Sequence, residues 1–524
     1  MNPHSRFFVT LPTYTWFRFV SFINLVVRRR RLSSLLVAGI TALVVVLMAT
    51  QPISSASAHP VRFPEVQPNE PRPHTAGSPR PNIVFIITDD QDTETLNYMP
   101  RVKRLLADEG TAFTNMFVTT PQCCPSHVTI LTGKYPHNSG VLNNWFDSGG
   151  GFQTFVNNGG DKSTIATWLQ ASGYRTARFG KYLVEYENTT YIPPGWSEWY
   201  AYYGSGKYFN YTLNENGTQV AYGNAPSDYS TDVLTEKVID FIDRPEENEP
   251  FFVFFAPAAP HGDGVPNGPA TPAPRHKGMF VGTQAPRTPS FNEADVSDKP
   301  RAISSLPLLT AAQVTAIDSE YQTRIESLQS VDEAVERIVN RLAALGQLEN
   351  TYVIFTSDNG YHLGQHRLRN GKTQVYEEDI RVPLVVRGPR VPVATTRDHL
   401  VATIDFAPTL AKLAHVKPNH VVDGQSFDKL FHRNPKSSAE WRKDFLVEVY
   451  RRNPPLGNGD AIRAVRSLDG VLYAEYQSGP KELYDLTTDP FELVSQHNLA
   501  PPEYLNALSV RLAELATCAG DTCR

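Results

Sequence analysis

Short apolar runs separated by helical patterns are the feature of this sequence that most restricts its fold. The runs are rich in β-branched and aromatic side chains and lie at residues 82–88, 176–179 (the weakest), 251–255, 352–356 and 382–386. Continuous apolar runs are typical of strands that are buried on both faces. Amphipathic helical patterns lie between them, the longest over residues 311–345. This alternation favours an α/β fold with a large, mostly parallel sheet sandwiched by helices.

The N-terminal part of the chain differs in character. A basic cluster at residues 28–31 and an apolar stretch at 35–49 precede small residues at 56–58, so we expect residues 1–58 to be a signal peptide. The apolar stretch is short for a bilayer span, and an uncleaved membrane anchor is the less favoured alternative. Residues 59–81 are rich in proline, which predicts an extended linker.

The pattern changes again near residue 432. We expect one domain over residues 82–432 and a small α+β C-terminal subdomain over 433–524, where short strand patterns precede a closing helix. Cys518 and Cys523 lie close together there, and in an exported protein they predict a short-loop disulfide rather than a metal-binding pair. The net charge of −5 over 524 residues gives no sign of nucleic-acid binding.

Polar side chains follow four of the predicted strands, at the point where each strand ends: Asp89, Asp90, Lys181, His261, Asp358 and Asn359. Because ligands bind at the carboxyl ends of strands in open α/β sheets, we expect these groups to meet at one edge. The acids and the amide are hard oxygen donors, which suit Ca²⁺ or Mg²⁺ better than zinc. For the Asp89–Asp90 pair alone, a solvated turn or a helix cap is the alternative interpretation.

Cys123 lies in the run Cys-Cys-Pro-Ser-His at residues 123–127. Pro125 is favourable in the first turn of a helix expected at residues 126–132, and Gly133 can end that helix. Cys123 would then lie just before a helix N-terminus, where a negative charge is stabilised. From the residues alone, an ordinary half-buried cysteine is an equally good interpretation.

These segments resemble the motifs of the sulfatase family. The run at residues 123–127, followed by Thr132-Gly133, is similar to that family's C-x-P-S-R and T-G pattern. Gly180-Lys181-Tyr182, Pro260-His261, Ser357-Asp358-Asn359-Gly360 and the segment 482–490 occur in the family's order. The resemblance covers about residues 82–499 and is strongest to N-acetylglucosamine-6-sulfatases and arylsulfatases, and it implies the alkaline-phosphatase-like form of the α/β fold.

The resemblance implies hydrolysis of a sulfate ester of a sugar or aryl alcohol. A formylglycine-generating enzyme would oxidise Cys123 to formylglycine (3-oxoalanine), whose hydrated form would attack sulfur. The modified Cys123 would share one Ca²⁺ with Asp89, Asp90, Asp358 and Asn359. Lys181 and Lys372 would bind the sulfate oxygens, and His261 would protonate the leaving alcohol.

The sequence departs from the family at His127, where the family carries a catalytic-site arginine. Histidine is shorter, often neutral and unable to form a bidentate contact, so we expect weaker support for the formylglycine and the metal ligands. The alternatives are a phosphate or phosphonate ester hydrolase of the same superfamily and a weakly active binder of sulfated glycans. We expect the protein to be secreted or exported to the periplasm or the cell envelope. The expected partner is a sulfated small molecule or glycan, with no stable membrane contact after signal cleavage.

Overall fold

The computed structural model describes residues 80–187, 189–204, 206–244, 249–263, 268–431, 433–452 and 460–524. The predicted signal peptide and all but the last two residues of the predicted linker lie outside these ranges and stay predictions. Within the described ranges, no helix combines the length and the apolar content needed to span a bilayer.

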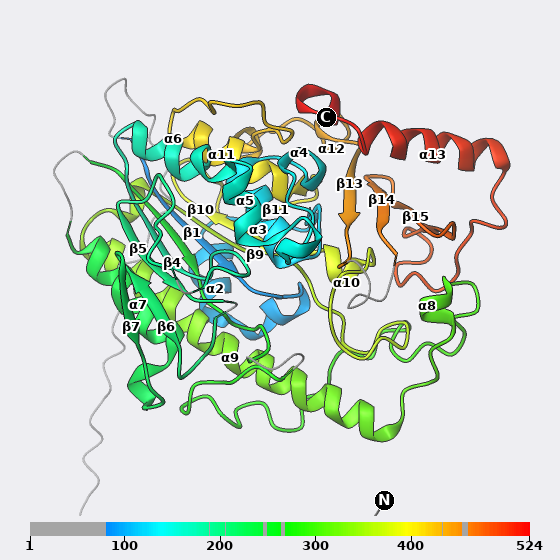
Figure 1. Ribbon diagram of the computed structural model, residues 1–524, viewed down its shortest axis with the longest axis horizontal. Coiled ribbons are helices and arrows are strands. Elements are labelled where there is room, and N and C mark those ends of the chain that lie inside the picture. Colours follow the sequence, from blue (N-terminus) through cyan, green and yellow to red (C-terminus); the bar gives the residue numbers. More distant parts are fainter. Residues whose placement is uncertain are drawn as a thin grey trace, which may run out of the picture. The chain divides into compact units, whose positions relative to one another are not determined.

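A mixed sheet of ten strands forms the centre of the described chain (Figure 1). Across the sheet the order is β11 (Thr395–Arg397), β2 (Thr111–Phe113), β10 (Leu384–Arg387), β9 (Thr351–Ser357), β1 (Asn82–Thr88), β8 (Phe251–Ala256), β4 (Arg175–Gly180), β5 (Glu198–Tyr202), β6 (Thr212–Glu215) and β7 (Thr218–Ala221). The central strands β9, β1, β8, β4 and β5 are parallel to one another. Strands β10, β6 and β7 pair antiparallel with their neighbours. The five predicted strands and the mostly parallel sheet are therefore confirmed, with β10 as an antiparallel member.

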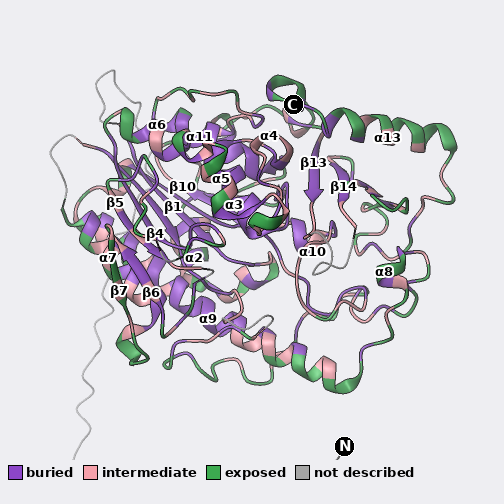
Figure 2. Cartoon of the chain, in the orientation of Figure 1, coloured by how far each residue is buried: buried purple, intermediate pink, exposed green. Residues whose placement is uncertain are grey.

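Helices cover both faces of this sheet because successive side chains of each central strand point to opposite faces. Ile83, Phe85 and Ile87 share one apolar core with residues of α3 (Cys123–Thr132), α6 (Ile165–Ala171) and α11 (Phe406–Leu413). Val84 and Ile86 share the other core with α7 (Ser230–Ile242) and α9 (Ala311–Ala344). Figure 2 shows the central strands buried, with exposed residues on the outward sides of the helices. Helices on both faces of the sheet confirm the predicted arrangement of a sheet sandwiched by helices.

The remaining elements of the main part are short. They are α2 (Pro100–Val102), which continues as a π-helical turn (Lys103–Ala107), β3 (Met116–Phe117), α4 (Pro136–Ser139), α5 (Gly151–Asn157), α8 (Arg301–Ser304), α10 (Glu377–Ile380) and β12 (Val401–Ala402). Single 3-10 turns lie at Glu94–Tyr98, Phe146–Ser148, Gly160–Lys162, Pro226–Asp228, Leu348–Asn350, Thr403–Asp405 and Asp428–Phe431. Strands β3 and β12 pair with each other in a separate two-stranded sheet.

A second, antiparallel sheet lies in the C-terminal part. Its strands are β13 (Asp444–Val449), β14 (Ile462–Ser467), β15 (Val471–Tyr476) and β16 (Lys481–Asp485), in that order, preceded by α12 (Ser438–Trp441) and followed by α13 (Pro502–Leu515) and a 3-10 turn (Gly520–Cys523). This confirms the small α+β C-terminal subdomain, while its predicted boundary at residue 432 stays a prediction.

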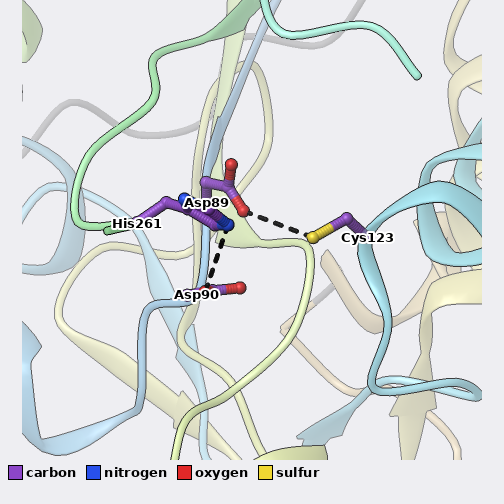
Figure 3. Close-up of side chains that lie close together, drawn as sticks. All are labelled: Asp89, Asp90, Cys123 and His261. Atoms are coloured by element: carbon purple, nitrogen blue, oxygen red, sulfur yellow. Dashed lines mark hydrogen bonds and ion pairs between the residues drawn. The ribbon is translucent and has the colours of Figure 1, made fainter. Parts of the chain in front are cut away.

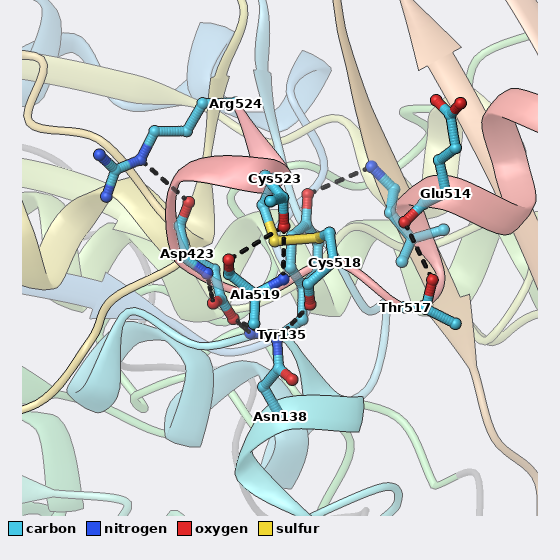
Figure 4. The surroundings of a disulfide bond; sticks show 12 residues. Tyr135, Asn138, Asp423, Glu514, Thr517, Cys518, Ala519, Cys523 and Arg524 are labelled. Carbon is cyan, nitrogen blue, oxygen red and sulfur yellow. Dashed lines mark hydrogen bonds between the residues drawn. A yellow bond between two sulfur atoms is a disulfide. The ribbon is translucent and has the colours of Figure 1, made fainter.

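The chain end is tied to the main part of the fold (Figure 4). The predicted disulfide between Cys518 and Cys523 is present. The carbonyl of Cys518 accepts a hydrogen bond of 2.8 Å from Asn138 Nδ2 in α4. Asp423 accepts from the backbone N–H of Gly520 and from that of Tyr135, each at 2.8 Å. The disulfide loop is therefore docked on the segment that directly follows α3.

Candidate active site

Three parallel strands deliver four of the predicted side chains to one edge of the sheet. Asp89 and Asp90 follow β1, Lys181 follows β4 and Asp358 follows β9. Each of these four residues is at most 2% exposed. Because the strands are parallel and in register, their carboxyl ends coincide, and the predicted meeting of these groups is confirmed.

Helix α3 brings Cys123 to the same edge. The helix begins at Cys123 and not at Ser126 as predicted, because Gln122 adopts an extended N-cap conformation and Pro125 is accommodated inside the first turn. Gly133 ends the helix with a left-handed φ of 70°, as predicted. Ser126 Oγ donates a hydrogen bond of 2.6 Å to the Asp358 carbonyl, which fixes the start of α3 to the end of β9.

Cys123 converges with two acids and an imidazole (Figure 3). Ligand atoms of Asp89, Asp90, Cys123 and His261 all lie within 4.8 Å of one another. Cys123 Sγ lies 3.7 Å from Asp89 Oδ1, and His261 Nε2 lies 3.8 Å from Asp90 Oδ2. His261 Nδ1 is 2.7 Å from the Gly262 carbonyl, so this ring edge points away from the acids.

Two lysines complete the arrangement. Lys181 Nζ forms an ion pair with Asp89 and lies 3.5 Å from Asp358 Oδ2. Lys372, in the loop after β9, donates from Nζ to Cys123 Sγ at 2.6 Å and also pairs with Asp90. Lys372 lies in a loop and not directly after a strand, and the fold nevertheless brings it to the site.

Asn359 joins the site through its amide group. Its Nδ2 donates to Asp90 Oδ1 at 2.7 Å, and its Oδ1 lies 3.4 Å from Lys372 Nζ. Asp358 Oδ2 is buried, and it makes only long contacts with Lys181 Nζ, at 3.5 Å, and with His127 Nε2, at 3.4 Å, among the described residues. Three buried carboxylates with an amide oxygen form the kind of oxygen-donor set that fits Ca²⁺.

Burial and charge together set the protonation states at this edge. Burial, reinforced by Asp358, raises the pKa of Asp89 well above its ordinary value. Asp358 is also buried, but Lys181 and His127 outweigh that effect and hold its pKa below the usual range. Burial raises the pKa of the Cys123 thiol to about 12, despite the two lysines. An unmodified Cys123 is therefore a neutral thiol at neutral pH and a poor nucleophile.

His127 lies behind Asp358 and contacts an arginine that the sequence reasoning missed. His127 Nε2 is 3.4 Å from Asp358 Oδ2, and Arg178 Nη2 is 3.3 Å from His127 Nδ1. Burial lowers the pKa of His127 to about 4, so the ring is neutral and accepts from the guanidinium at Nδ1. The guanidinium of Arg178 therefore lies near Asp358 but is separated from it by the His127 ring.

The Arg178 side chain is fully buried among aromatic rings. Its guanidinium carbon lies 4.2 Å from the centre of the Phe254 ring and 4.9 Å from that of Tyr182. Its Nη2 also donates to the Lys181 carbonyl, whereas Nε and Nη1 have no hydrogen-bond partner among the described residues. The signal in the sequence was a charged residue inside the weakest of the predicted strands.

Arg324, on α9, was also missed. It donates to the backbone carbonyl of Asp90 and, at 3.2 Å, to that of Pro260. The guanidinium stacks 3.8 Å from the centre of the Tyr361 ring. Arg324 therefore joins the turns after β1 and β8. Its position in the sequence, between Tyr321 and Ile325 on the apolar stripe of α9, could have revealed it.

Comparisons with known proteins agree with this geometry. A family model described as Sulfatase matches residues 81–416, and one described as N-sulphoglucosamine sulphohydrolase, C-terminal, matches residues 364–516. Human N-acetylglucosamine-6-sulfatase is 37% identical over 487 residues, covering 86% of this chain and 87% of the relative. An arylsulfatase of Volvox carteri is 34% identical over 500 residues, covering 86% and 76% respectively.

A solved structure gives the same result for the fold. A protein described in complex with its substrate D-glucosamine-2-N,6-O-disulfate matches with a TM-score of 0.69 and 25% identity, covering 83% of this chain and 97% of that chain. The matched family model spans β1, α3, β4, β8 and β9, which carry the site. The chain belongs to the sulfatase family.

Proposed function

We propose that this sulfatase removes the 6-O-sulfate of a glucosamine unit in a sulfated sugar or glycan, through a formylglycine at position 123 and one Ca²⁺. The observation that carries the proposal is the position of Cys123 at the first turn of α3, among three buried carboxylates and two lysines. The sugar is supported by the relative named N-acetylglucosamine-6-sulfatase and by the structural neighbour with a glucosamine disulfate substrate. Aryl sulfates are the second substrate class, supported by the relative named arylsulfatase.

The state of the Cys123 thiol supports the modification. Burial raises the pKa of the thiol to about 12, against the effect of the two lysines, which disfavours a thiolate nucleophile at this position. A hydrated aldehyde at this position supplies an oxygen nucleophile, and bound Ca²⁺ supplies Lewis-acid polarisation of the sulfate. We assign the metal-ligand roles to Asp89, Asp90, Asp358 and Asn359, together with the modified residue.

The cationic side chains have separate proposed roles. Lys181 and Lys372 neutralise the sulfate oxygens, since both carry raised pKa values from the surrounding acids, despite burial, and stay protonated. Nε2 is the edge of His261 that is directed toward the leaving alcohol, because its Nδ1–H donates to the Gly262 carbonyl. Burial lowers the pKa of the ring to about 4, while Asp90 favours the charged form. His261 therefore acts as the acid only in its imidazolium form, in which Nε2 also carries a proton. His127 contacts no substrate in this proposal. It positions Asp358.

Export is proposed on two observations. The order of basic, apolar and small residues before residue 59 is that of a signal peptide. The Cys518–Cys523 disulfide is of the kind that persists in an oxidising compartment. Mass spectrometry of the protein recovered from outside the cytoplasm of its native host should show an N-terminus near residue 59. A full-length protein retained in the cytoplasm would contradict this proposal.

The proposed chemistry is tested on protein purified from the native host. The mass of the peptide that contains Cys123 should be that of the aldehyde or its hydrate, and an unmodified thiol would exclude the formylglycine mechanism. The same preparation is assayed with N-acetylglucosamine 6-sulfate, an aryl sulfate, and a matching aryl phosphate and phosphonate. We expect sulfate release with the sugar ester strongest. Faster turnover of the phosphate or phosphonate would favour the other hydrolase class.

A further inference from the structure

A second cluster of ligand-type side chains lies outside the active site. A ring nitrogen of His366 and a carboxylate oxygen from each of Glu378 and Glu492 lie within 4.8 Å of one another. His366 belongs to the loop after β9, Glu378 to α10 and Glu492 to the segment after β16. We propose that these three residues bind a divalent transition-metal ion, Zn²⁺ or Mn²⁺, which links the Lys372 loop to the C-terminal subdomain. No part of this proposal depends on the proposed substrate.

The setting of His366 is that of a metal-binding histidine. The residue is fully buried, and its Nδ1 lies 2.7 Å from Glu293 Oε2. Its Nε2 is buried and has no hydrogen-bond partner among the described residues. A carboxylate that holds one ring nitrogen, and so fixes the direction of the other, is the usual support of a metal-ligating imidazole. Without a bound ligand, burial of Nε2 would cost free energy, because this atom loses its hydrogen bonds to water and gains no partner in return.

The two carboxylates also have unused binding capacity. Glu378 Oε1 accepts a long hydrogen bond of 3.3 Å from Ser290 Oγ, while Oε2 is buried without a partner among the described residues. Glu492 is 1% exposed, and both its oxygens lie 3.3 Å from the backbone N–H of Glu377. Ligand oxygens of the two carboxylates lie within 4.8 Å of each other, and a cation between them would offset their mutual repulsion.

The nearby lysine does not take this place. Lys299 Nζ is directed at the backbone carbonyl of Glu492, at 2.9 Å, and at Glu293 Oε1, at 3.3 Å. It therefore balances Glu293 rather than the pair formed by Glu378 and Glu492. A divalent ion would balance that pair.

The donor types select the ion. One imidazole nitrogen and two carboxylate oxygens are a mixed set that suits Zn²⁺ or Mn²⁺, whereas Ca²⁺ takes six or more oxygens. A water molecule can supply a fourth ligand. One of the three residues, Glu378, also lines an open cavity, together with Gln365, Glu377 and Phe491. This site therefore differs in chemistry from the oxygen-rich active site.

The test uses the full chain, stripped with a chelator and returned to excess Ca²⁺ so that the active site is saturated. Zn²⁺ and, separately, Mn²⁺ are titrated by calorimetry into the wild-type protein and the His366→Gln variant. We expect the wild-type protein to bind one more equivalent than the variant, and only the wild-type Tm to rise with the added ion. Any Zn²⁺ held by Asp89, Cys123 and His261 persists in both proteins and cancels in the comparison.

The matched control is His137→Gln. His137 also contacts a carboxylate through Nδ1, Glu448 at 2.7 Å, but its Nε2 is already 3.0 Å from the Cys518 carbonyl. This variant should keep the extra equivalent. If His366→Gln folds poorly, Glu492→Gln is a second variant that removes a metal ligand. The glutamine amide oxygen can still accept a hydrogen bond from the Glu377 N–H, so this variant should fold. Equal stoichiometry in the wild-type protein and both loss variants, or no extra equivalent in the wild-type protein, would overturn the proposal.

Discussion

Arg178 and His127 act as a pair, and the pair changes what the departure from the family motif means. In the sequence, His127 replaces the arginine of the family motif, so the site was expected to lack a guanidinium group. In the structure Arg178 supplies a guanidinium from β4, and neutral His127 lies between it and Asp358. We therefore regard His127 and Arg178 together as the support of Asp358.

Replacing Arg178 by methionine tests this support. Methionine keeps most of the volume among Phe254 and Tyr182 but removes the charged donor to His127. A hydrogen bond to a charged group contributes about 1.5–3 kcal/mol, so we expect kcat/KM to fall about 10- to 150-fold and Ca²⁺ to bind more weakly. Steady-state kinetics across a Ca²⁺ titration measure both effects.

The control for that variant is Arg175→Met on the same strand. Arg175 is buried at the opposite end of β4, where its Nη2 donates to the Phe241 carbonyl at 2.7 Å. Its loss should lower stability and leave the Ca²⁺ dependence of kcat/KM unchanged. Equal Ca²⁺ dependence in the two variants would show that Arg178 is merely structural.

Restoring the family arginine with His127→Arg should not help by itself. The new guanidinium would lie in a buried space between Arg178 and Asp358, where His127 now contacts both residues. We expect Tm to fall, because an inadequately paired buried charge costs several kcal/mol, about 3–5 in measured cases. The double variant His127→Arg/Arg178→Met should recover both Tm and activity. A single variant as stable as the wild-type protein would contradict the close pairing.

At the scale of elements, the strand ends were predictable and the helix start was not. Asp89, Asp90 and Asp358 follow continuous apolar runs, whose period and end are explicit in the sequence. The start of α3 was placed three residues late, because Gln122 caps it through backbone conformation alone, without a side-chain hydrogen bond. Arg178 and Arg324 were missed because their partners are backbone carbonyls and rings that only tertiary packing brings near.

Gly180 shows how tightly β4 positions Lys181. It adopts a φ of 101°, and a Cβ there would lie 2.0 Å from the Ala256 carbonyl oxygen of β8. We expect Gly180→Ala to displace Lys181, to lower kcat/KM by at least about tenfold and to destabilise the chain by more than about 1 kcal/mol. Kinetics and thermal denaturation provide the measurement.

Gly217→Ala separates backbone conformation from steric contact. Gly217 has a similar φ of 92°, but nothing lies within 4 Å of the point that a Cβ would occupy. An alanine at position 217 would therefore adopt an unfavourable left-handed conformation but would meet no steric clash. Its kcat/KM should equal that of the wild-type protein, and a loss comparable to that of Gly180→Ala would point to a general effect of positive φ.

At the scale of the whole molecule, the C-terminal disulfide loop fastens the end of the chain to the main part of the fold. It docks through Cys518 and Gly520 on Asn138 and Asp423, beside the segment that follows α3. Closing a loop of about five residues stabilises by about 2 kcal/mol in the chain-entropy description. We expect the Cys518→Ser/Cys523→Ser variant to unfold at a lower temperature, with a Tm that no longer responds to reductant. An unchanged Tm would show that the docking contacts suffice.

The burial of Cys123 also has a consequence for the order of events during biosynthesis. The residue is 2% exposed and closes the first turn of α3 against the ends of the central strands. Under the proposed formylglycine mechanism, the converting enzyme would have to reach this side chain before α3 forms. Folding and modification would then compete for the same segment of the nascent chain. A molecule that folded first would keep the thiol unless it unfolded again.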